Sequence, residues 1–171
     1  MKNKFNYYFL PICLILILAF SRLIPHPWNF TPVLALGIFS GFYFKNFILS
    51  FFIVIISMFI SDIYLGFHNT MLFTYVSLTA AVALGLFITR FKFSEILISG
   101  LLSSIFFFLI TNFGAWITLE IYEKNISGLI ASYTMAIPFF HNTLISTFLY
   151  LFILKFIFEF VFRKKIQIVN G

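Results

Sequence analysis

Ten side chains of this sequence are of types that bind small molecules, and they interrupt segments that are otherwise apolar. They are Arg22, His26, Trp28, Asn29, Asp62, Asn112, Trp116, Glu120, His141 and Asn142. The charged and amide groups could hydrogen-bond to a polar solute, and the two tryptophans could stack on a ring. Asn112, Trp116 and Glu120 are spaced at i, i+4 and i+8, so they would share one face of a helix.

Each of these residues also has a simpler interpretation. Tryptophan gathers at the headgroup level of membranes, and asparagine can tie two helices together. Polar groups inside hydrocarbon are costly, however, and tend to face a bundle interior or a water-filled cavity. For the set as a whole, the sequence favours a binding pocket.

Motifs of common enzymes are absent. No G-x-x-x-x-G-K-[ST], H-E-x-x-H or G-x-S-x-G occurs, so the corresponding ATP-hydrolysing, metalloprotease and hydrolase mechanisms are not expected. The three histidines could hold a metal with Asp62, but their separation is not diagnostic. An enzyme would need an acid and a base in reach, which only His141 with Asp62 or Glu120 provides. We therefore expect no enzyme, no cofactor and no metal.

The composition indicates that lipid surrounds the chain. Of its 171 residues, 62% are hydrophobic and 9% are charged, whereas a soluble domain has about a quarter charged. The net charge of +6 needs no nucleic-acid partner, because lysine and arginine collect at the cytoplasmic ends of membrane spans. The lipid bilayer is thus the first expected partner.

Six apolar segments approach the length of about 20 residues, with a range of about 17 to 25, that crosses a bilayer as a helix. The predicted spans are residues 7–24, 28–44, 47–65, 70–88, 96–119 and 137–162. They form one domain of the all-α class, a polytopic six-helix membrane bundle.

Three parts of this prediction have alternatives. The second span is the shortest and follows Pro25-His26-Pro27, which breaks a helix, so it could only dip into the membrane. The first could be a signal peptide cleaved near Ala19-Phe20-Ser21. In the linker 120–136, apolar residues recur at helical spacing and part of it is expected in the interface.

Charge placement predicts the orientation. With the N-terminus inside, six spans place most basic residues on the inner side: Lys2, Lys4, Lys45, Arg90, Lys92, Arg163, Lys164 and Lys165. The outer side keeps only Arg22 and Lys124, so both termini are expected on the cytoplasmic side of the membrane. Near the inner end, Lys155 and Glu159 are expected to neutralise each other. The ten candidate residues then all map to the outer side.

Small residues form two grooves at four-residue spacing. Gly37 and Gly41 lie in the second span, and Ala81 and Gly85 lie in the fourth. Such pairs allow close helix contact, so they are candidates for internal packing or for docking of a partner helix.

Five spaced motifs carry a resemblance to a known family. They are RLIPHPWNFTP at 22–32, Ala35 with Gly37 and Gly41, Ser61-Asp62 with Gly66, TNFG at 111–114 with Trp116, and PFFHN at 138–142. From about Ser21 to the end of the sixth span, they resemble an uncharacterised family of bacterial membrane proteins that is assigned a transport role. That family is considered similar to the substrate-binding S components of energy-coupling-factor (ECF) transporters.

The resemblance implies a six-helix, multi-pass protein of the bacterial inner (cytoplasmic) membrane that binds a vitamin or similar micronutrient from the outer side. It also implies a membrane coupling subunit and ATPase subunits as partners. Many S components dock through A-x-x-x-A in the first helix, whereas the first span here has only Ala19.

The leading hypothesis is a substrate-binding subunit for uptake of a small water-soluble metabolite. The alternative is a structural membrane scaffold of the rod-shape-determining type, without solute transport. The sign of the solute stays open: Arg22 and the histidines favour an anion, whereas Asp62, Glu120 and Glu123 favour a cation.

Overall fold

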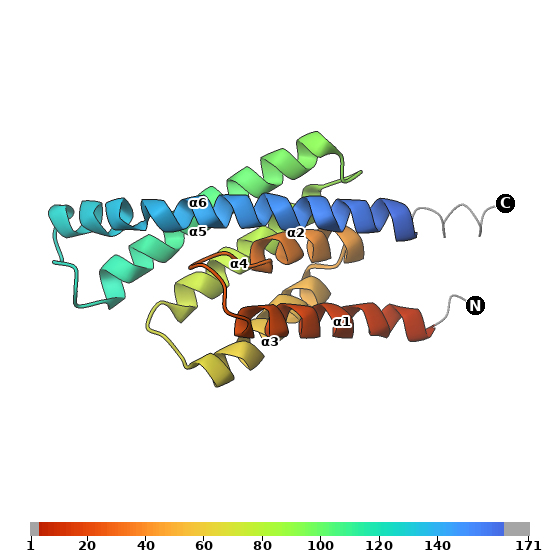
Figure 1. Cartoon of the computed structure of the whole chain (residues 1–171), viewed down its shortest axis with the longest axis horizontal. Helices are drawn as coiled ribbons and strands as arrows, with labels where there is room; N and C mark the ends of the chain where they lie inside the picture. Colours follow the sequence, from red (N-terminus) through yellow and green to blue (C-terminus); the bar gives the residue numbers. More distant parts are fainter. Residues whose placement is uncertain (1–3, 163–171) are drawn as a thin grey trace.

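The computed structural model describes residues 4–162, and this part of the chain is helical and contains no strand. The elements are α1 (Lys4–Leu23), α2 (Val33–Phe44), α3 (Phe47–Leu65), α4 (Met71–Phe87), α5 (Phe93–Thr118), α6 (Ile126–Ile157) and a short π-helical end, η1 (Phe158–Phe162). Figure 1 shows them side by side, with the beginning of α1 and the end of α6 at the same end of the molecule. The expected all-α class is confirmed.

Three helices in the described range are long and apolar enough to cross a membrane. They are α3, α5 and the stretch Ile126–Phe160 that contains α6. The apolar part of α1 and helices α2 and α4 are shorter. Long apolar helices of this kind indicate a membrane protein.

Helix α2 is the centre of the bundle. Every residue from Val33 to Phe42 is buried, and the five other helices all contact α2, with α4 as its main neighbour. The surrounding helices instead carry many exposed leucine, isoleucine and phenylalanine side chains on their outer faces, as a lipid-facing surface requires.

The two small-residue grooves meet each other between α2 and α4. Gly37 lies against Ala81, and Gly41 lies against Gly85 and the backbone of Val82. All four small residues are buried, so their absence of bulk lets the two backbones approach. Within the described chain these residues serve internal packing, and none of them is exposed for a partner helix.

Two helices begin elsewhere than the apolar segments suggested. Helix α2 starts at Val33 because the preceding link folds into a turn, with the Phe30 amide donating to the Pro27 carbonyl and Asn29 at φ 60°. Helix α6 starts at Ile126, well before residue 137, because the Asn125 side chain accepts the Gly128 amide and caps it. Pro138 removes one backbone hydrogen bond without ending α6.

Basic side chains close one end of the bundle. The Lys45 ammonium donates to the Leu86 and Ile88 carbonyls at the end of α4, and that of Lys155 donates to the Phe91 carbonyl and pairs with Glu159 at 2.6 Å. Burial lowers the pKa of Lys45, against the opposite effect of Glu95. The predicted inner residues Lys2, Arg163, Lys164 and Lys165 lie outside the described range.

Candidate functional site

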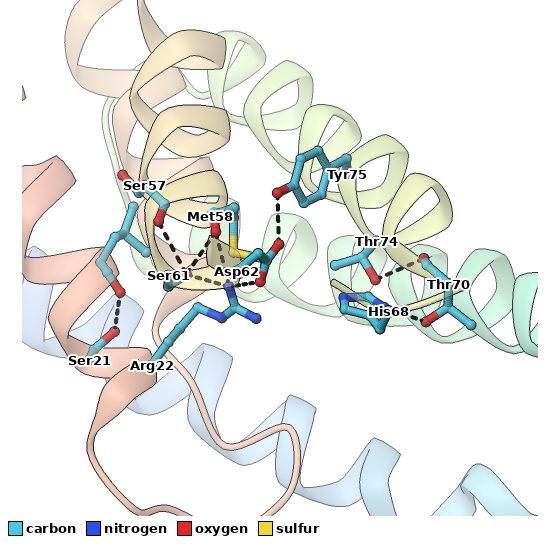
Figure 2. Close-up of polar contacts among 11 residues, drawn as sticks. Ser21, Arg22, Ser57, Met58, Ser61, Asp62, His68, Thr70, Thr74 and Tyr75 are labelled. Atoms are coloured by element: carbon cyan, nitrogen blue, oxygen red, sulfur yellow. Dashed lines mark hydrogen bonds and ion pairs between the residues drawn. The ribbon is translucent and has the colours of Figure 1, made fainter. Parts of the chain in front are cut away.

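An ion pair joins α1 to α3 at the end opposite the lysines. Arg22, in the last turn of α1, donates from Nη1 to Asp62 Oδ1 at 2.5 Å, in the last turn of α3. The same nitrogen also donates to the Ser61 hydroxyl and to the Met58 carbonyl. Tyr75 of α4 donates its hydroxyl to Asp62 Oδ2 at 2.7 Å. Figure 2 shows the three contacts of Arg22 meeting at its Nη1 nitrogen and the Tyr75 hydroxyl pointing to the Asp62 carboxylate from α4.

The Asp62 carboxylate is fully buried, and the Arg22 side chain is 16% exposed. A buried charge is tolerated only when a partner and further hydrogen bonds compensate its lost hydration. Arg22 and Tyr75 provide that compensation, so the cluster fixes the ends of α1, α3 and α4 relative to one another.

The link between α1 and α2 is held by α6. Asn142 donates its amide to the Trp28 carbonyl at 2.9 Å, and the Ser146 hydroxyl donates to the Asn29 carbonyl at 3.4 Å. One turn further along α6, the Tyr150 ring packs edge-on against Phe30. Asn142, Ser146 and Tyr150 are spaced at i, i+4 and i+8 on one face of α6, and together they hold the non-helical link in place.

A cavity of about 880 Å³ lies between this link and the helices. Its size is that of a small-molecule site, and residues from all six α-helices line it. The polar lining residues are Arg22, His26, Asn29, Thr31, His68, Asn69, Thr70, Thr74, Thr111, Asn112, Thr143, Ser146 and Thr147. Met58, Leu78, Phe107 and Phe139 are among the apolar ones.

Half of the ten candidate residues line the cavity: Arg22, His26, Trp28, Asn29 and Asn112. The Trp28 side chain is 78% exposed, so it lies at the rim. Asp62 and Asn142 are one layer behind, where they hold Arg22 and the link.

Trp116, Glu120 and His141 do not line the cavity. Trp116 donates its ring N–H to the Glu123 carbonyl in the turn after α5. Glu120 lies beyond the last residue of α5, and His141 is exposed on α6. Each i to i+4 step turns a helical position by about 40°, which carries Trp116 away from the cavity that Asn112 lines.

A comparison with protein families gives the relationship of the chain. Residues 2–169 match the model of a family of unknown function, DUF6580. The chain belongs to this family. No curated protein matches it significantly, and no solved structure does. These comparisons show no likeness to ECF S components.

In this DUF6580 protein the cavity also uses threonines that the candidate set did not contain. Thr70 and Thr74 of the α4 start, and Thr143 and Thr147 of α6, form two i, i+4 pairs that line it. The i, i+4 spacing of these threonines was the signal that the sequence offered. Two of these four hydroxyls donate to a carbonyl one turn earlier, Thr74 to Thr70 and Thr143 to Phe139.

The described residues contain no group of three or more His, Cys, Asp and Glu side chains that could hold a metal ion. His68 instead contacts the Thr70 hydroxyl through Nδ1 at 2.9 Å, and His26 contacts the Ile24 carbonyl at 2.5 Å. The chemistry that the cavity offers is therefore hydrogen bonding and charge.

Proposed function

We propose that this protein crosses the inner membrane of a bacterium six times and is a substrate-binding subunit for uptake of a small water-soluble metabolite. The observation that carries the proposal is the cavity of about 880 Å³, which all six helices line and into which α1, α4, α5, α6 and two of the links bring guanidinium, hydroxyl, amide and imidazole groups. Ligand pockets usually combine an apolar wall with polar groups that orient the ligand, and both kinds of residue line this cavity.

The length of α2 supports a cavity at membrane depth. Its 12 residues span only about 18 Å, against a hydrocarbon core of about 30 Å. The rest of the crossing falls on the non-helical link from Ile24 to Pro32. Irregular backbone is tolerated at that depth only when protein buries it or when it lines a water-filled cavity, and most residues of the link line this one.

The position of the lysines supports an outward opening. Lys45 and Lys155 lie at the end of the bundle opposite Arg22, and basic residues favour the cytoplasmic side. An outward pocket suits a protein that captures a solute before it crosses the membrane.

Energy for uptake would come from a separate module, a membrane coupling subunit with ATPase subunits, because the sequence has no phosphate-binding loop. The buried residues Gly37, Gly41, Ala81 and Gly85 are occupied between α2 and α4. The module would therefore contact other, exposed helix faces.

The test is a thermal-shift screen of the full-length protein, purified in detergent, against vitamins, nucleobases, nucleosides and amino acids. A ligand of the cavity raises the unfolding temperature, because binding to the folded state alone stabilises it. The matched control is Ala115→Phe, which adds a ring at a lining position. We expect a shift in the natural protein that the filled variant loses.

A scaffold of the rod-shape-determining type is the competing function, because the Arg22–Asp62–Tyr75 cluster would serve packing alone equally well. A scaffold predicts that no compound shifts the unfolding temperature. It also predicts that Ala115→Phe leaves the unliganded protein as stable as before or more stable, since it fills empty space. A screen with that result would count against the transport proposal.

A further inference from the structure

We propose that the cavity takes a small organic anion, whose carboxylate or phosphate group lies at Arg22 and the start of α2. This inference rests on the proposed function and names the chemical class of its substrate. Four observations on the lining carry it.

The first observation is the sign of the ionisable groups. Arg22, His26 and His68 line the cavity, and no aspartate or glutamate among residues 4–162 does. Asp62 is fully buried and accepts from Arg22 and Tyr75 with its two oxygens. Glu120 and Glu123 are exposed in the turn after α5. The acids that favoured a cation are thus elsewhere, and histidine can add positive charge.

The second observation is the unused part of the Arg22 guanidinium. Its three contacts to Met58, Ser61 and Asp62 all come from Nη1. No described residue accepts from Nε or Nη2, and in Figure 2 every dashed line from the group starts at one nitrogen. A guanidinium offers five N–H donors in a fork that matches an oxyanion. The ion pair with Asp62 orients the guanidinium and leaves its Nε and Nη2 donors for a ligand.

The third observation is the open N-terminus of α2. Its first residues, Val33 and Leu34, line the cavity, and the capping position is Pro32, which has no side-chain acceptor. The first amides of a helix have no partner within it and carry the positive end of the helix dipole. An anion is the ligand that such amides stabilise.

The fourth observation is the Thr147 hydroxyl. Thr147 lines the cavity and is fully buried, and its Oγ1 has no hydrogen-bond partner among the described residues. Thr74, Thr111 and Thr143 differ, since each donates to a carbonyl one turn earlier. A buried hydroxyl without a partner is costly, so a small shift of the side chains that cover the Thr147 Oγ1 would let a ligand in the cavity satisfy it.

The experiment compares probes of equal shape and different charge. Thermal shifts of the full-length protein in detergent are measured with benzoate, benzamide and benzylamine, with indole-3-acetate, indole-3-acetamide and tryptamine, and with inorganic phosphate. We expect the carboxylates or phosphate to raise the unfolding temperature by about 2 °C or more at saturation. The amides and amines should give less than half of that shift.

Two variants locate the effect. Arg22→Lys keeps the charge beside Asp62 but removes the fork, and Thr147→Val removes only the hydroxyl. Each should weaken binding of the best anionic probe by about tenfold, the loss expected for one hydrogen bond to a charged group. Thr147→Val should leave the unliganded protein as stable as before, which separates a binding role from a packing role. His141→Ala, exposed and away from the cavity, should bind normally.

The outcomes are distinct. Equal or larger shifts with the amines or amides would overturn the anion assignment and leave the proposed function standing. The assignment would also be overturned if both variants bound the anionic probe as tightly as the natural protein. Absence of a shift with every probe, together with a blank screen of metabolites, would overturn the inference and the proposed function together.

Discussion

Arg22 and Asp62 were both expected at the outer end of the bundle as contacts for a solute, and the structure joins them to each other at 2.5 Å. Each residue type is costly in an apolar segment, so the sequence already marked both positions. Their partnership could not be predicted, because the two residues are 40 positions apart and meet only through the packing of α1 on α3. The same packing removes Asp62 from the cavity and leaves Arg22 in its wall.

We predict that Asp62→Asn destabilises the protein by about 3 kcal/mol, since it leaves the Arg22 charge without its partner in a largely buried site. Tyr75→Phe removes one hydrogen bond to the same carboxylate and should cost about 1 kcal/mol. Thermal unfolding of the purified variants in detergent measures both losses.

A double variant separates charge compensation from simple packing. Replacing both partners by apolar residues, as in Arg22→Met with Asp62→Leu, should recover most of the stability that Asp62→Asn loses, because no buried charge remains. It should nevertheless abolish anion binding. If Asp62→Asn were as stable as the natural protein, the pair would contribute nothing to the fold.

At the scale of helices, the contact of α2 with α4 depends on the absence of side chains. A Cβ atom at Gly41 would overlap the Val82 carbonyl oxygen, whereas one at Gly37 would lie 3.4 Å from the Ala81 Cβ, an ordinary contact. Sequence spacing identified both glycines but could not rank them, because the rank depends on where the two helices cross.

Gly41→Ala should therefore destabilise the protein by about 2 kcal/mol, the usual cost of overpacking a tight interface. Gly37→Ala is the matched control and should be nearly neutral. Unfolding temperatures of the two variants, measured side by side, give the comparison. If the two variants lost equal stability, the result would contradict the close approach of α2 and α4 at Gly41.

The carboxylate of Glu95 caps the start of α5. It accepts the backbone amides of Thr89, Arg90 and Lys92 and the Thr89 hydroxyl. Desolvation raises the pKa of Glu95, but the hydrogen bonds from Thr89, Lys92 and Arg90 outweigh it and lower the pKa from 4.5 to about 2. A cap of this kind orders the turn between α4 and α5.

A depressed folded-state pKa stabilises the protein above the unfolded-state value and loses that effect as the pH falls. The contribution of Glu95 should thus be complete above pH 4.5 and disappear as the pH falls towards about 2. Glu95→Ala should be less stable than the natural protein by about 1 kcal/mol at neutral pH. This difference in the free energy of unfolding should disappear as the pH falls from 4.5 to about 2. Chemical unfolding at several pH values measures it, and a gap that did not change with pH would contradict the prediction.

At the scale of the whole molecule, the all-α class and the gathering of polar residues at one end followed from composition and charge placement. Thr147 shows the limit of such reasoning, since its role depends on lining a cavity that six helices form together. The early start of α6 was missed for a local reason. Asn125 caps the helix at Ile126 and Pro138 does not end it, whereas hydropathy alone favoured a start after the polar linker.

The number of membrane crossings depends on whether α2 crosses the membrane completely. In a background with Cys13→Ser, single cysteines are placed at three exposed positions, Asn69 and Arg90 in turns and Ser127 in the first turn of α6. With six crossings, a membrane-impermeant maleimide should label the cysteines at 69 and 127 in intact cells and the cysteine at 90 only after permeabilisation. If α2 only dipped into the membrane, every later helix would cross in the opposite direction, and all three results would reverse. Because the cavity lies at the same end as Asn69, that reversal would make it face the cytoplasm and would exclude capture of a solute from outside.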